Sequence, residues 1–181
     1  MHVTHSCSCC GDLLHGRYDR RRFLRAAGIG GLAAALPFRA RAAEGDYEAM
    51  LVSCIDPRMV TPVYKYMEGR GLEGKYSQFV IAGAAIAVVA PKFAAWRTAF
   101  WDNLATSVEL HRLKGVIAID HRDCGAAKIA YGEDSIATPE IETKTHREVL
   151  AEFRRAVAEH HPQLTIVTGL MALDGSIEIF S

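Results

Sequence analysis

Two short apolar runs, each ending in candidate metal ligands, constrain this chain more than any other feature. Residues 49–53 lead directly into Cys54, and residues 115–119 lead through one aspartate into His121 and Cys124. Brief apolar runs bounded by polar residues predict buried strands. The segments that follow them have helical patterns, so we expect a parallel sheet with helical crossovers, in which the carboxyl ends of both strands meet at one edge.

The rest of the chain predicts an α/β fold with a mostly parallel central sheet and flanking helices. We expect helices at 59–71, 94–113 and 140–160, and further strands at 78–81, 163–169 and 176–180, the last at the sheet edge. In the second helix a four-residue spacing indicates a core-facing stripe of Trp96, Phe100, Leu104 and Val108. Four histidines in helical or terminal contexts are expected to be solvated: His111, His146, His160 and His161.

The residues at the two strand ends suggest a catalytic metal site. In extended chain Cys54, Asp56 and Arg58 point to one side. His121 and Cys124, three residues apart, can share one face of a tight turn or of a first helical turn. Two thiolates and one imidazole make three ligands, the number that zinc has when its fourth position is left for water or substrate.

Two other interpretations of these residues stay open. The three ligands could form a structural zinc site, with Asp56 and Arg58 as an ordinary surface ion pair. Structural sites usually have four protein ligands, however, and often C-x-x-C pairs, and these three ligands show neither feature. A disulfide between Cys54 and Cys124 is a weaker interpretation, because it leaves His121 and Asp56 without a role.

Length and charge limit the class of protein. A chain of 181 residues, half of them hydrophobic, can bury one core and does not require two domains. Seven of the 21 basic residues but only two of the 21 acidic residues lie in residues 1–42, which leaves 14 basic and 19 acidic residues in 43–181. This acidic remainder argues against nucleic acid as a partner.

The first 42 residues resemble a twin-arginine export signal. Paired arginines followed by Phe-Leu occur in residues 19–25, residues 26–38 are mildly apolar, and residues 40–42 form an A-x-A cleavage pattern. We therefore expect a signal peptide over 1–42, one domain over 43–181 and a periplasmic location. The apolar run is too short for a membrane span, so no stable span is expected after cleavage. A basic amphipathic helix on the membrane surface is the alternative.

Export by this route bears on the cysteines. The twin-arginine pathway, as the resemblance implies, carries folded proteins, so a metal loaded inside the cell could protect Cys54 and Cys124 from oxidation. Three further cysteines lie upstream of the paired arginines and could bind a metal or be oxidised. We expect them to be discarded with the leader: Cys7, Cys9 and Cys10.

With Cys54-x-Asp56-x-Arg58 and His121-x-x-Cys124-Gly125 in order, the chain resembles the β-class carbonic anhydrases. Residues 107–127, and residues 165–169 followed by Asp174-Gly175, add to the likeness. The resemblance implies zinc bound by Cys54, His121 and Cys124, with Asp56 and Arg58 beside the open position as catalytic residues. It also implies reversible hydration of carbon dioxide to bicarbonate, and a homodimer or higher homo-oligomer, because in this fold the site normally lies at a subunit interface.

One segment departs from the family pattern. Where the family usually has Arg-Asn-Ala-Gly after its second strand, this chain has only small apolar residues, Ala82 to Ala85. A more apolar site would favour a related zinc hydrolase acting on carbonyl sulfide or carbon disulfide. A protein of another class, a non-catalytic module that binds zinc or bicarbonate, is also compatible with the ligands alone.

Overall fold

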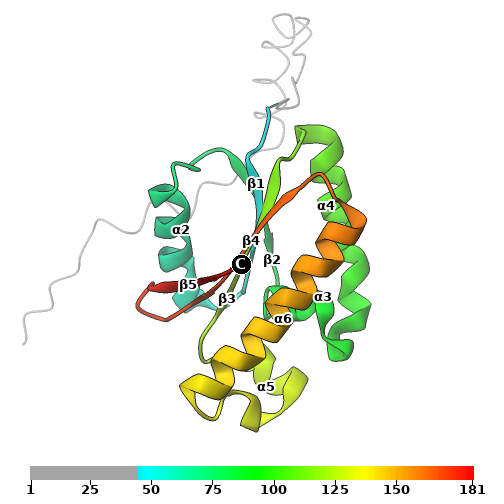
Figure 1. Cartoon of the computed structure of the whole chain (residues 1–181). Helices are drawn as coiled ribbons and strands as arrows, with labels where there is room; N and C mark the ends of the chain where they lie inside the picture. Colours follow the sequence, from blue (N-terminus) through cyan, green and yellow to red (C-terminus); the bar gives the residue numbers. More distant parts are fainter. Residues whose placement is uncertain (1–44) are drawn as a thin grey trace, which may run out of the picture. The chain divides into compact units, whose positions relative to one another are not determined.

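The computed structural model describes residues 45–181, which form a five-stranded sheet with helices on both faces (Figure 1). The sheet order is β2-β1-β3-β4-β5; β1 to β4 run parallel, and β5 is an antiparallel edge strand. The predicted α/β class and the edge position of the last strand are therefore confirmed. The strands are β1 (Ala49–Ser53), β2 (Tyr76–Val80), β3 (Gly115–His121), β4 (Thr165–Met171) and β5 (Ile177–Phe180).

The predictions for residues 1–42, including the export signal, its cleavage and the cluster of Cys7, Cys9 and Cys10, lie outside the described residues. Within 45–181 no helix has the length and apolar character needed to cross a membrane.

The helices divide between the two faces of the sheet. They are α2 (Val60–Gly69), α3 (Ala85–Val89), α4 (Arg97–His111), α5 (Gly125–Tyr131) and α6 (Pro139–His160), with 3-10 segments η1 (Pro57–Met59), η2 (Pro91–Trp96) and η3 (Glu133–Ile136). Helix α2 lies on one side of the sheet, and α3, α4 and α6 lie on the other (Figure 1). The sequence predicted α2, α4 and α6 but not α3 and α5, because five and seven residues are too few to show a helical period.

Two apolar cores account for the order of these layers. Under α2, Val63 and Met67 pack against Leu51 and Ile117; on the other face Phe100, Leu104, Leu150 and Phe153 are fully buried. Every residue of β1 and β3 is buried, which explains why residues 49–52 and 115–119 are continuously apolar instead of alternating. Each large side chain buried in this way contributes roughly 1.5–3 kcal/mol relative to exposure.

The direction in which successive strands are added to the sheet reverses between β1 and β3. The chain passes from β1 to its neighbour β2, then crosses back to place β3 on the other side of β1. In an open parallel sheet the crevice at such a switch point, at the carboxyl ends of the strands, is the usual ligand site. Both predicted groups of ligands leave strands at this crevice.

Two burial predictions are wrong. His146 is not solvated but 0% exposed, because it occupies the apolar face of α6 three, four and seven residues before the buried Val149, Leu150 and Phe153. Trp96 is 39% exposed, because it lies in η2, whose 3-10 geometry does not continue the period of α4; Phe100 and Leu104 are buried as predicted.

Candidate metal centre

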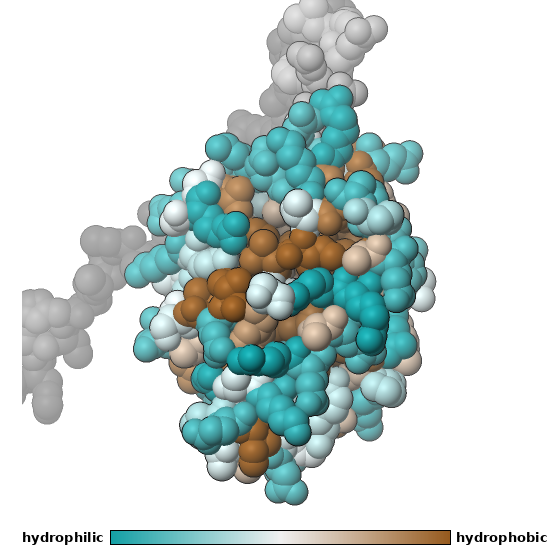
Figure 2. All heavy atoms as spheres, in the orientation of Figure 1, coloured by the Kyte–Doolittle hydropathy of each residue, from teal (hydrophilic) through white to brown (hydrophobic). Residues whose placement is uncertain are grey.

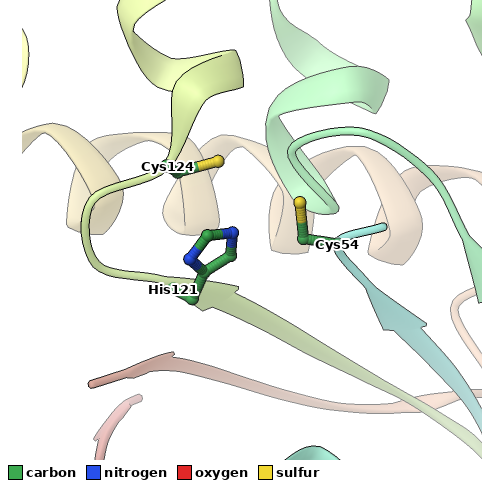
Figure 3. Close-up of side chains that lie close together, drawn as sticks. All are labelled: Cys54, His121 and Cys124. Carbon is green, nitrogen blue, oxygen red and sulfur yellow. The ribbon is translucent and has the colours of Figure 1, made fainter. Parts of the chain in front are cut away.

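The three predicted ligands converge at the ends of β1 and β3. Cys54 follows β1, His121 ends β3 and Cys124 precedes α5, and their side chains point toward one another (Figure 3). All three are buried, and their ligand atoms lie within 4.8 Å of one another. The turn between His121 and Cys124 is tight because Asp123 adopts a left-handed conformation with φ 56°. The predicted three-residue spacing therefore acts through a turn.

The hydrogen bonding of His121 leaves one ring nitrogen for a metal ion. Its Nδ1 donates to the backbone oxygen of Arg122 at 2.8 Å. A neutral imidazole with a proton on Nδ1 carries its lone pair on Nε2. This Nε2 is buried and has no hydrogen-bond partner within residues 45–181. A metal ion would satisfy it, and the bond from Nδ1 to a backbone oxygen is typical of histidines that bind metals.

The two cysteines share one negative charge more easily than they hold two. The neighbouring Cys124 thiol, together with His121 and the Gly83 N–H, lowers the pKa of Cys54 despite its burial. The pKa of Cys124 is raised, chiefly because Cys54 beside it takes the negative charge and because Cys124 is buried. A divalent cation between the sulfurs would favour both thiolates at once.

The donor set and its spacing fit zinc. With Zn–S near 2.3 Å, two thiolates of a tetrahedral site lie about 3.8 Å apart, within the separation seen here. Two sulfurs and one imidazole nitrogen suit zinc better than oxygen-preferring ions such as magnesium or calcium. The described residues offer three such ligands at this point, and a fourth position can be taken by water or substrate.

Asp56 and Arg58 form a two-pronged ion pair at the edge of the centre. Arg58 Nε donates to Asp56 Oδ1 at 3.0 Å, and Nη2 donates to Oδ2 at 2.6 Å. Asp56 is also the N-cap of η1, where it accepts the Arg58 N–H at 2.9 Å, and Pro57 suits the first helical position. The local sequence Asp-Pro-Arg thus fixes both side chains. Hydrogen bonds from Arg58 lower the pKa of Asp56 to about 2.

Arg58 also connects the two segments that carry the centre: residues 54–58 after β1, here called the β1 limb, and residues 121–124 at the end of β3, here called the β3 limb. Arg58 Nη1 donates to Asp123 Oδ2 at 2.8 Å, and its Nη2 to the backbone oxygen of Asp123 at 3.2 Å. Asp56 Oδ2 lies 4.0 Å from His121 Nε2, so the carboxylate borders the ligand cluster without hydrogen-bonding to it. At neutral pH the site therefore presents an ionised acceptor next to the three ligands.

The segment Ala82 to Ala85 supports the centre through its backbone. The Gly83 N–H donates to Cys54 Sγ at 3.2 Å. Gly83 has φ 84°, and a Cβ there would lie 2.8 Å from the Cβ of Ala126, so only glycine fits. The polar side chains expected of the family are absent here, but the amide contact to the thiolate is made by the main chain.

Sequence reasoning missed the contacts behind the centre. Glu142 of α6 accepts the Asp123 N–H at 2.5 Å and pairs with Arg122 at 3.1 Å. Asp120 and His146, both buried, bond to each other at 2.9 Å. The signal available in the sequence was the spacing of His146 with the apolar residues of α6.

A cavity of about 280 Å³ opens beside Cys54, between α2 and the strands β1 and β2. Of the three ligands only Cys54 lines it, and its walls are mainly apolar. They comprise Leu51, Ser53, Met59, Val60, Thr61, Val63, Tyr64, Tyr76, Gln78 and Val80.

Comparison with known proteins gives close sequence relatives and distant structural ones. No protein-family model matches the chain. An uncharacterized protein of Rickettsia bellii is 38% identical over 129 residues, which cover 71% of this chain and 79% of the relative. The uncharacterized protein RC0076 of Rickettsia conorii is 36% identical over 129 residues, covering 71% and 69%. The chain belongs to the family of these rickettsial proteins.

Solved structures that share the fold include β-carbonic anhydrases. One of the two tetrameric β-carbonic anhydrases of the ascomycete Sordaria macrospora superimposes with a TM-score of 0.51 at 14% identity, covering 89% of this chain and 94% of that chain. The Coccomyxa β-carbonic anhydrase in complex with acetazolamide gives 0.51 at 13% identity, covering 90% and 86%. The fold is therefore the β-carbonic anhydrase fold, and the activity is a separate question.

Proposed function

We propose that the protein is a zinc enzyme that catalyses the reversible hydration of carbon dioxide to bicarbonate. The observation that carries the proposal is the buried convergence of Cys54, His121 and Cys124, with an unpartnered His121 Nε2, beside the Asp56–Arg58 pair. The shared fold with β-carbonic anhydrases supports it. A structural zinc site would not need an ionised carboxylate at the open side of three ligands.

The chain's own residues divide the chemistry between them. When bound, zinc supplies a water molecule that is acidic enough to act as a nucleophile near neutral pH. Asp56, whose pKa Arg58 lowers to about 2, stays ionised at neutral pH and accepts a hydrogen bond from the nucleophile. A group with so low a pKa is a poor proton carrier near pH 7, so its role is to orient the nucleophile. Arg58 keeps Asp56 in place.

Location and assembly complete the proposal. We propose export to the periplasm, on the twin-arginine pattern of residues 19–25. We also propose a homodimer or higher homo-oligomer. On the face in Figure 2, apolar groups gather across the middle, where β4 and β5 run, and Leu173 and Ile179 of this hairpin are 40% and 49% exposed. Exposed apolar groups on an edge strand favour association with another chain. The Sordaria protein is a tetramer.

Stopped-flow measurement of carbon dioxide hydration, with zinc quantified in the same preparation, tests the activity. The wild-type protein is expected to hold about one zinc per chain and to turn over. Asp56→Asn keeps the shape of the side chain but not its charge, and is expected to retain zinc and lose about 100-fold or more in turnover. Zinc without hydration in the wild type would contradict the proposal and favour a non-catalytic zinc-binding module.

A second candidate is hydrolysis of carbonyl sulfide or carbon disulfide by the same centre. The apolar cavity beside Cys54 favours it, because these molecules are less polar than bicarbonate. Turnover of the sulfur compounds without hydration of carbon dioxide would select this function.

A further inference from the structure

A buried pair of side chains, Asp120 and His146, lies directly behind the metal centre and takes no part in the chemistry described so far. Asp120 is 1% exposed and His146 is 0% exposed. His146 Nδ1 donates to Asp120 Oδ2 at 2.9 Å. A carboxyl group and an imidazole removed from water are costly unless they are hydrogen-bonded, so the place of this pair in the core requires an explanation.

Asp120 connects the strand of one ligand to the loop that contacts another. It precedes His121 in β3, and its Oδ1 accepts the backbone N–H of Ala85 at 3.0 Å. Two residues earlier in the same loop, the Gly83 N–H donates to Cys54 Sγ at 3.2 Å. The intervening Ala84 has φ 49°, a conformation that alanine rarely adopts and that needs support from its surroundings. The bond from Ala85 to Asp120 is such a support.

His146 fixes the other oxygen of Asp120 from helix α6. One turn earlier on the same helix, Glu142 accepts the Asp123 N–H at 2.5 Å. Residues at i and i+4 lie on one helical face. This face of α6 therefore holds the chain on both sides of His121, through Asp120 before it and through Asp123 after it.

We propose that Asp120 and His146 are positioning residues of the metal centre. Their hydrogen bonds hold the loop 83–85 where the Gly83 N–H meets Cys54 Sγ, and so keep Cys54 in register with His121 and Cys124. The inference rests on the metal site of the proposed function, but not on the identity of the substrate. Contacts that orient metal ligands typically contribute 10- to 100-fold to metal affinity.

Three substitutions at one position separate positioning from simple space-filling. In His146→Asn the amide nitrogen takes the place of Nδ1, which keeps the donor to Asp120 but leaves a void. In His146→Leu the volume is mostly kept and the donor is lost. In His146→Gln the amide nitrogen takes the place of Nε2 instead. If His146 acts by positioning, His146→Asn should keep metal affinity closest to that of the wild type. If it only fills space, His146→Leu should do so.

The measurement is binding of cobalt and of zinc by the full chain. Cobalt reports geometry, since thiolate-to-cobalt absorption depends on how the two sulfurs are arranged, and zinc affinity is obtained by competition with a chelator. His146→Leu and His146→Gln are expected to lose about 10-fold in zinc affinity and to show an altered cobalt spectrum. His146→Asn is expected to stay within about two-fold of the wild type.

Thr168→Val is the matched control. Thr168 is fully buried in β4, donates to the Phe180 backbone oxygen at 2.9 Å, and pairs in register with Ala118, three residues before His121. Its loss is expected to lower thermal stability without changing metal affinity or the cobalt spectrum. If His146→Leu does not fold, the comparison between Asn and Gln still decides the question.

The inference is overturned if Leu, Gln and Asn all bind cobalt and zinc as the wild type does. It is also overturned if zinc affinity follows thermal stability through the whole set, Thr168→Val included. A wild-type protein that binds neither metal would overturn the proposed function, and this inference with it.

Discussion

The two limbs of the metal centre are built in opposite ways. The β1 limb buries only Cys54, and its other functional residues are more exposed: the Asp56 side chain is 16% exposed and that of Arg58 is 44% exposed. The β3 limb is enclosed, with His121 and Cys124 each 1% exposed and helix α6 holding the turn between them. If the proposed function holds, this difference predicts that the β3 limb holds the metal more rigidly and that the β1 limb, apart from Cys54, presents the chemistry.

The largest expected effect, the loss of zinc affinity when a cysteine is removed, should be similar in the two limbs. Cys124→Ala and Cys54→Ala each remove one of three ligands, and each is expected to lower zinc affinity by about 100-fold or more and to abolish turnover. Equilibrium dialysis against a zinc buffer measures the affinity. A large loss from only one of the two cysteines would show that they do not share one ion.

The next effect separates turnover from metal binding. Arg58→Gln removes the ion pair that holds Asp56, so turnover is expected to fall about 10- to 100-fold while zinc content is unchanged. Arg147→Gln is the matched control. Arg147 forms an exposed ion pair with Glu178, in which the charged atoms are 3.0 Å apart, and this pair includes none of the three proposed ligands. Loss of zinc in Arg58→Gln would contradict the division between the limbs.

A substitution behind the β3 limb should have the reverse effect of Arg58→Gln: it should lower zinc affinity and leave turnover per bound zinc unchanged. Glu142→Ala leaves the Asp123 N–H without its acceptor and removes the ion pair with Arg122, and is expected to lower zinc affinity about 10-fold. Turnover per bound zinc should stay near that of the wild type, as measured by hydration rate at saturating zinc. Glu148→Ala, at an exposed site on the same helix, should change neither quantity.

The smallest effect concerns the bridge between the limbs. Asp123→Asn removes the ion pair with Arg58, in which the two side chains are 53% and 44% exposed. Exposed pairs contribute about 1 kcal/mol or less, so thermal unfolding and zinc affinity are expected to change little. A loss of affinity equal to that of Glu142→Ala would mean that the limbs depend on each other for metal binding.

The sequence determined the parts of this protein that depend on local order. Continuous apolar runs ending in Cys54 and His121 predicted two buried parallel strands, and the carboxyl-edge rule predicted that their ligands meet. The period of α6 predicted a helix of nearly the observed length. The family resemblance predicted the fold, which is confirmed.

Only the tertiary structure decided what supports the site. The amide that contacts Cys54 belongs to Gly83, 29 residues away, and no side-chain pattern shows where a backbone N–H points. His146 was expected in water, yet its place on α6 faces Asp120 across the core. Such contacts arise when helix and strand pack together, because burial favours polar groups that find a partner, and sequence spacing alone does not specify which one.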